Sequence, residues 1–129
     1  MILCDTDVMI DYWNKTNIRH TSTKAIVEET IGINNVVLSA ITKIELLTGA
    51  TNKADMKRIS KNLDQWIIAL LDIDITLTSF SLIEKYSLSH GLALPDSIIA
   101  ATALSTNLDL FTYNVKDYKF ISGLKLFKP

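Results

Sequence analysis

Apolar residues form short continuous runs along the chain, and longer segments between these runs repeat them every three or four positions. The runs at 1–4, 36–38 and 108–112 are short enough to be strands buried on both faces of a sheet. Residues 73–77 alternate apolar side chains with acids and threonine, which predicts another strand near one edge. Residues 124–127 are a candidate fifth strand.

Helical spacing of apolar residues predicts six helices between these strands. Their expected ranges are 8–14, 22–31, 40 to about 49, 53–71, 79–90 and 96–106. Asp7 is expected to cap the first helix and Gly32 to end the second. Pro95 has the fixed backbone angle that suits the first turn of the last helix.

Strands that alternate with helices predict right-handed crossovers and an α/β fold, with a mainly parallel sheet of four to five strands covered by helices on both faces. The chain has 129 residues, of which 48% are hydrophobic. That length is enough for one continuous core and too short for two ordinary domains, so we expect a single domain over residues 1–129.

The charge balance excludes a strongly basic nucleic-acid-binding protein. Thirteen Lys and Arg stand against fourteen Asp and Glu, a net charge of -1, so any contact with a nucleic acid must come from a local patch. The best patch is Lys53, Lys57, Arg58 and Lys61, although such a cluster is usually a solvated helix face.

The cellular compartment is indicated by cysteine usage and by the apolar segments. Cys4 is the only cysteine and is expected to be a small buried residue, so no disulfide framework is possible. The chain lacks the pattern of a secretion signal and an apolar run of the ~20 residues that a membrane span needs. We therefore expect a soluble cytoplasmic protein without membrane contact.

Acidic and amide side chains recur where the predicted strands end. Asp5 follows the first strand, Glu45 lies in the helix after the second, and Asp96 opens the helix that leads to the strand at 108–112. Asn114 and Asp117 follow that strand. Ligand sites in parallel sheets collect beyond the carboxyl ends of the strands, so these side chains are expected to converge on one edge.

Carboxylates near a core boundary need a partner, and hard divalent ions such as Mg²⁺ or Mn²⁺ prefer oxygen ligands. A bound ion of this kind polarises a phosphodiester and activates water, so no histidine base is required. His20 and His90 lack the spacing of a zinc site. The pattern thus favours metal-assisted phosphodiester hydrolysis.

Each acid also has a structural interpretation. Asp7 and Asp96 could be helix caps, and Glu45 could pair with Lys43 or with a distant arginine. Taken singly, these interpretations are the more common ones. The combination of an acid after the first strand, an acid inside an apolar helix and Pro-Asp at the start of a late helix is more specific.

Four segments carry a resemblance to a known family. They are Cys4-Asp5-Thr6-Asp7-Val8-Met9-Ile10-Asp11, Ser39 through Glu45-Leu46, Leu94-Pro95-Asp96-Ser97-Ile98-Ile99-Ala100-Ala101-Thr102-Ala103, and Leu110-Phe111-Thr112-Tyr113-Asn114-Val115-Lys116-Asp117-Tyr118. In this order they resemble the four motifs of PIN domains. Length and spacing are similar to those of VapC-type toxins, and the resemblance covers essentially the whole chain.

This resemblance implies a three-layer α/β/α fold and an endoribonuclease that depends on Mg²⁺ or Mn²⁺. It also implies a toxin that is commonly a homodimer and is neutralised by an antitoxin encoded beside it. Asp5, Glu45 and Asp96 match the three core acids of the family. We expect Asp5 and Asp96 to bind the metal and Glu45 to position or deprotonate the attacking water.

The chain departs from the family pattern at two positions. The fourth family acid falls at Asn114, whose neutral oxygen binds a cation less strongly, and Asp117 is a possible substitute. Asp7 stands where relatives usually have serine or asparagine. Thr112 matches a family hydroxyl that hydrogen-bonds near the acids, and with Asn114 it is expected to support the cluster.

Three other functions remain open. The opening Asp5-Thr6-Asp7-Val8 resembles that of haloacid-dehalogenase phosphatases, but Met9 and the length of the chain fit that class poorly. A phosphoacceptor receiver domain would leave Glu45 and Asp96 unexplained. A PIN-like scaffold that has lost catalysis and binds only a partner is the third.

Overall fold

The computed structural model describes all residues, 1–129, and contains one sheet of four parallel strands. The strands are β1 (Ile2–Cys4), β2 (Val36–Ser39), β3 (Ile67–Ala69) and β4 (Asp109–Phe111), in the order β3-β2-β1-β4. In register, Leu3 of β1 pairs with Val37 of β2 and with Leu110 of β4. The predicted parallel sheet is confirmed, and β1 lies inside it with its carboxyl end flanked by β2 and β4.

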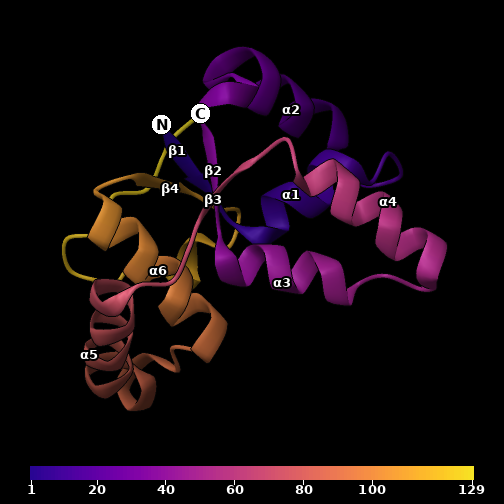
Figure 1. Ribbon diagram of the computed structural model, residues 1–129. Helices are drawn as coiled ribbons and strands as arrows, with labels where there is room; N and C mark the ends of the chain where they lie inside the picture. Colours follow the sequence, from indigo (N-terminus) through magenta and orange to yellow (C-terminus); the bar gives the residue numbers. More distant parts are fainter.

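Helical segments connect the strands. They are α1 (Thr6–Trp13), α2 (His20–Ala25), a π-helix η1 (Ile26–Ile31), a 3-10 helix η2 (Ile33–Asn35), α3 (Ala40–Thr48), α4 (Lys53–Leu63), α5 (Ile73–His90), α6 (Leu94–Thr106) and a 3-10 helix η3 (Val115–Asp117). In Figure 1, α5 and α6 lie together on one side, and α1, α2 and α4 lie on the other. The three-layer arrangement follows from this placement. No helix combines the length and the apolar character needed to cross a membrane.

Alternating side chains of the strands fill two hydrophobic cores. Leu3, Val37 and Leu110 point to the face covered by α5 and α6. Cys4 and Phe111 point to the opposite face, toward α1 and α4. Successive side chains of a strand point to opposite faces, so each helical layer buries its own set of strand residues. Cys4 is fully buried, as predicted, and burial raises the pKa of its thiol to about 12.

The predicted strand at 73–77 is wrong, because these residues form the start of α5. Asp72 caps this helix, with its Oδ1 accepting a hydrogen bond from the backbone N of Ile75 at 2.8 Å. In a strand, Ile73, Ile75 and Leu77 would share one face. Ile75 is buried, but Ile73 and Leu77 are 77% and 58% exposed. Burial instead follows helical spacing through Ser79 and Leu82.

The third strand lies where the sequence predicted the end of a helix over 53–71. The helix α4 ends at Leu63, and Ile67–Ala69 pairs with β2 at the edge of the sheet. A short apolar run does not distinguish a strand from a buried helical turn by its periodicity. The candidate fifth strand is reduced to one bridge between Leu126 and Leu110.

Candidate active site

Three acidic side chains reach the carboxyl edge of the sheet from three different elements. Asp5 directly follows β1, Glu45 lies in the middle of α3, and Asp96 is in the first turn of α6. The negative charge of Glu45 raises the pKa of Asp96, and that of Asp96 raises the pKa of Asp5. These three acids therefore lie on the same side of the sheet, with Asp96 within electrostatic range of both Asp5 and Glu45.

Asp5 is the most enclosed of these acids, at 4% exposed. Its Oδ1 accepts a hydrogen bond from the backbone N of Thr6 at 2.8 Å, and its Oδ2 accepts one from Thr112 Oγ1 at 2.8 Å. Burial raises the pKa of Asp5 to about 7, with help from the charges of Asp7 and Asp96, although both hydrogen bonds act in the opposite direction. A nearby cation would relieve this cost of ionisation.

Glu45 is held by the residue that follows Asp5. Thr6 Oγ1 donates a hydrogen bond to Glu45 Oε1 at 2.8 Å and lies 3.0 Å from Thr42 Oγ1. Glu45 forms no ion pair with Lys43 or with an arginine, because the only ion pairs of the chain are Asp11–Arg19 and Asp55–Arg58. The structural interpretation of Glu45 as a paired surface acid is therefore wrong.

Asp96 is positioned by a buried tyrosine. The hydroxyl of Tyr118 donates a hydrogen bond to Asp96 Oδ1 at 3.0 Å, and Tyr118 itself is 1% exposed. Burial raises the pKa of Asp96, and the charges of Asp117, Glu45 and Asp7 raise it further, against the lowering effect of the Tyr118 hydrogen bond. Pro95 precedes Asp96 in the first turn of α6, as the sequence predicted.

The segment after β4 carries the remaining predicted residues. Thr112 is buried, and its Oγ1 both donates to Asp5 and accepts a hydrogen bond from the backbone N of Asn114 at 3.0 Å. The side chain of Asn114 is exposed and forms no hydrogen bond within the chain. Asp117, in η3, lies close enough to Asp96 for its charge to raise the pKa of that group. Asp117 thus extends the acidic group, while Asn114 contributes through its backbone.

Asp7 has a different role from the predicted helix cap. Asp5 is the cap of α1, and Asp7 lies in the first turn. Asp7 Oδ2 accepts a hydrogen bond from the backbone N of Tyr113 at 3.0 Å, while Asp7 Oδ1 is buried without any partner. Burial raises the pKa of Asp7 too. We refer to Asp5, Asp7, Glu45, Asp96 and Asp117 together as the acidic cluster.

Thr6 and Tyr118 were not predicted as site residues from the sequence. Both lie inside the motif segments, but each acts through one hydroxyl hydrogen bond to an acid 39 or 22 residues away in the chain. Residue pattern alone does not indicate such a contact. Their position beside Asp5 and Asp117 was the only available signal.

The acidic cluster has the donor chemistry of a site for a hard divalent cation. Its ligands are carboxylate oxygens, several with raised pKa, and Asp7 Oδ1 is buried without a partner. No three of its acids are arranged so that they could enclose an ion by themselves. Mg²⁺ usually keeps several waters and takes only one or two protein carboxylates, so a site for this ion does not need three acids around it.

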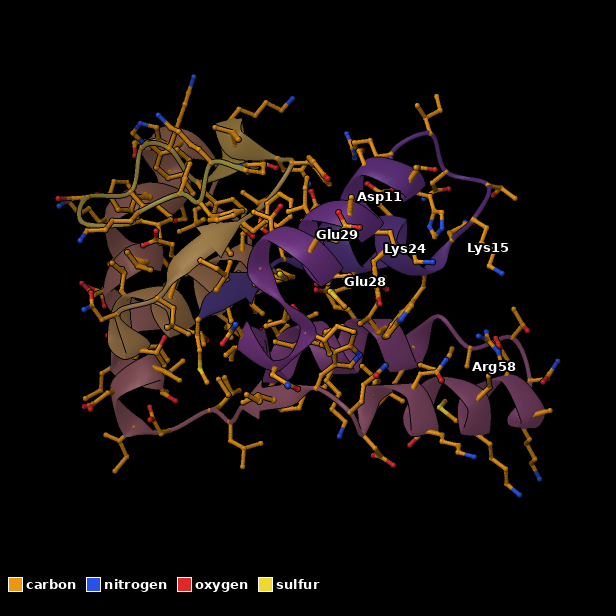
Figure 2. All side chains as sticks on the ribbon, turned by 90° about the horizontal axis from the view of Figure 1, so that it is seen from above. Asp11, Lys15, Lys24, Glu28, Glu29 and Arg58 are labelled. Carbon is orange, nitrogen blue, oxygen red and sulfur yellow. The ribbon has the colours of Figure 1, made fainter.

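A groove of about 530 Å³ adjoins the cluster at Glu45. Its walls come from α1, α3, α4 and the segment after α1, and they include Lys15 and Arg58, which lie on the same side of the molecule in Figure 2. Of the predicted basic patch, which lies on α4, only Arg58 lines this groove. One guanidinium nitrogen of Arg58 forms an ion pair with Asp55. Lys53, Lys57 and Lys61 remain exposed on the surface of α4.

A parallel α/β/α fold with carboxylates gathered at the carboxyl edge of its sheet defines the class of this protein. The sequence model of the PIN-domain family matches residues 2–120 of the chain. The chain belongs to the PIN-domain family. This confirms the resemblance, and the phosphatase and receiver hypotheses are set aside.

Similar proteins agree with this assignment. Ribonuclease VapC1 of Methanocaldococcus jannaschii is 28% identical over 98% of this chain and 86% of its own. A toxin-antitoxin complex from Klebsiella pneumoniae contains a chain with 31% identity and a TM-score of 0.76, covering 96% of this chain and 95% of that one. VapBC-1 from nontypeable Haemophilus influenzae gives 25% identity and a TM-score of 0.77, covering 99% and 98%.

Proposed function

We propose that this protein is an endoribonuclease that hydrolyses RNA phosphodiester bonds with the help of Mg²⁺ or Mn²⁺. The observation that carries the proposal is the meeting of Asp5, Glu45 and Asp96 at one edge of the sheet from β1, α3 and α6. The relative from Methanocaldococcus jannaschii named Ribonuclease VapC1 supports RNA as the substrate.

Asp5 and Asp96 are the proposed ligands of the cation. Each is fixed through one carboxylate oxygen by a hydroxyl, Asp5 by Thr112 and Asp96 by Tyr118. A divalent cation bound there supplies electrostatic stabilisation of the phosphodiester and lowers the pKa of an attacking water. Ligands held in advance by outer hydrogen bonds lose less freedom on binding.

Glu45 is the proposed base. Thr6 holds Glu45 Oε1 at 2.8 Å, and no hydrogen bond occupies Oε2, so that oxygen is free to orient a water and accept its proton. Glu45 lines the groove beside α4, which gives it access to solvent. Thr6 donates hydrogen bonds to both Asp5 and Glu45, through its backbone N and its hydroxyl, and therefore positions the ligand and the base relative to each other. Thr112 donates a second hydrogen bond to Asp5. The backbone of Asn114 in turn holds the Thr112 hydroxyl.

The biological role that fits this activity is that of the toxin of a toxin–antitoxin pair, acting in the cytoplasm. Several solved relatives are toxin-antitoxin complexes, which supports a protein antitoxin as partner. We also propose that the chain forms a homodimer. Light scattering of the purified protein tests the dimer, and co-purification with the product of an adjacent short reading frame tests the antitoxin.

Cleavage of a mixed single-stranded RNA pool tests the activity. The wild-type protein should cut RNA when Mg²⁺ or Mn²⁺ is present and should lose the activity in excess chelator. Asp5→Asn should abolish cleavage, and Asp74→Asn, which changes an exposed acid of α5, should leave it unchanged. A wild-type protein that binds its antitoxin but cuts no RNA with either metal would instead be a partner-binding scaffold.

A further inference from the structure

Arg19 has an arrangement that no other basic residue of the chain shares. Its Nε donates a hydrogen bond to Asp11 Oδ2 at 2.8 Å, and the guanidinium carbon lies 4.1 Å from the centre of the Tyr113 ring. The Tyr113 hydroxyl is fixed in turn by Thr23, 2.5 Å away. The guanidinium is thus held at one edge by a carboxylate and on one face by an aromatic ring.

The ion pair with Asp11 leaves most of the binding capacity of Arg19 unused. Asp11 is buried, and its other oxygen accepts a hydrogen bond from Asn17 Nδ2 at 2.8 Å. A guanidinium has five N–H donors, and only the Nε–H of Arg19 has an acceptor in the protein. The side chain is 52% exposed, so the terminal nitrogens are available to a ligand. Figure 2 shows the position of Asp11 on α1.

This cation borders the acidic cluster. The backbone N of Tyr113, on whose ring Arg19 lies, donates to Asp7 Oδ2 at 3.0 Å. The charge of Arg19 lowers the pKa of Asp7, so the two side chains are within electrostatic range. The negative charge of the cluster repels a phosphodiester chain, and a fixed positive group beside the acids counteracts this repulsion.

We propose that Arg19 binds a phosphate of the nucleic-acid strand next to the one that is cut, through the terminal nitrogens that Asp11 leaves free. This inference rests on the proposed function and names a residue that places the substrate. Tyr113 and Asp11 hold the guanidinium in its binding orientation before the strand arrives. Arginine is suited to this role because its planar fork can donate two hydrogen bonds to one phosphate.

The alternative is that Arg19 only neutralises Asp11 and stabilises the contact between α1 and α2. That role would affect folding but would not create a phosphate contact. The two roles differ in the salt dependence of RNA binding, because each phosphate contact to a single strand contributes about 0.7 to the slope of log K against log salt concentration.

Fluorescence anisotropy with a labelled single-stranded RNA of mixed sequence measures that slope. Binding is followed over a range of NaCl in Ca²⁺ and, in parallel, in chelator, for the wild type, Arg19→Ala, Arg19→Lys and Lys85→Ala. Lys85 is the matched control, because its ammonium also lies over a tyrosine ring, 5.3 Å from that of Tyr86, on α5 at the other side of the sheet.

Arg19→Ala should weaken binding about tenfold at low salt and reduce the slope by about 0.7, equally for different RNA sequences. Arg19→Lys should keep part of the slope, and Lys85→Ala should match the wild type. The assignment of Arg19 is overturned if the wild type binds RNA and Arg19→Ala binds it with the same affinity and slope. It is also overturned if Lys85→Ala loses as much affinity and slope as Arg19→Ala. In both cases the ribonuclease proposal stands. A wild type that binds no RNA overturns both.

Tyr113→Leu gives a second test that keeps the charge. Without the ring the guanidinium loses its fixed orientation, so binding should weaken by a smaller factor than in Arg19→Ala. Circular dichroism and thermal unfolding of each variant report whether the fold persists. If Arg19→Ala does not fold, Arg19→Lys and Tyr113→Leu carry the test, and wild-type affinity and slope in both would overturn the inference.

Discussion

The hydroxyl of Tyr118 donates a hydrogen bond to Oδ1 of Asp96 at 3.0 Å, from a position where Tyr118 is 1% exposed. This bond crosses from the segment after β4 to the first turn of α6 and fixes a proposed cation ligand. An aromatic side chain packed in the core thus determines the orientation of an acid at the surface of the sheet edge. Substitution of Tyr118 by phenylalanine removes this single oxygen.

Tyr118→Phe should lower cation affinity and RNA cleavage by about 10–100-fold, since the loss of a hydrogen-bond partner of a metal ligand has effects of this size. Isothermal titration with Mn²⁺ and a cleavage assay measure the two quantities. Tyr86→Phe is the control, because Tyr86 is also buried and its hydroxyl also forms one hydrogen bond, which lies away from the acids. In that bond the Tyr86 oxygen accepts from the backbone N of Ser122. Equal losses in both variants would indicate a general packing effect.

Asp5→Asn should make the protein more stable at high pH while it removes activity. The pKa of Asp5 is about 7 in the folded chain and near 3.8 in the unfolded one, so the folded state binds the extra proton between these values. Wild-type stability therefore falls as pH rises from about 4 to about 7. The variant lacks this loss and should be more stable by about 1–3 kcal/mol at pH 8.

Thermal unfolding of both proteins at pH 4 and pH 8, in chelator, measures this difference. At pH 4 the wild-type carboxyl is neutral in the folded state, so the two stabilities should approach each other. An advantage of Asp5→Asn that is as large at pH 4 as at pH 8 would contradict the assigned pKa.

Cation binding should become weaker as pH falls. Below about pH 7 Asp5 holds a proton that the cation must displace, so apparent affinity for Mn²⁺ should drop by up to about tenfold per pH unit between pH 7 and pH 5. Titration calorimetry in buffers of different ionisation enthalpy measures the proton release directly. Affinity that is constant over this range would mean that Asp5 is not a ligand.

Asp7→Asn should lower the pKa of Asp5. Asp7 contributes a negative charge that raises this pKa, second only to burial, and an amide removes the charge while it keeps an oxygen for the Tyr113 backbone N. Carbon-detected NMR of the carboxyl groups follows the titration. Asp109→Asn, in β4, is the control for the loss of one acid and should leave Asp5 unaffected.

The sequence by itself determined the parts of the fold that depend on local pattern. Cys4 and its neighbours read as a buried strand, Pro95 marked the start of α6, and spacing placed Asp5, Glu45 and Asp96 after strands or within the following helices. The parallel sheet then required them to share one edge, because crossover connections leave the carboxyl ends of neighbouring strands side by side. Resemblance in the same segments identified the family.

Tertiary structure decided what local pattern leaves open. Ile73–Leu77 alternates like a strand, but burial of Ile75 against α6 and capping by Asp72 make it helical, since packing outweighs the weak preferences of a five-residue run. The bond from Tyr118 to Asp96 and the stacking of Arg19 on Tyr113 join residues 22 and 94 positions apart. Such contacts depend on how whole elements pack, and no short-range periodicity encodes them.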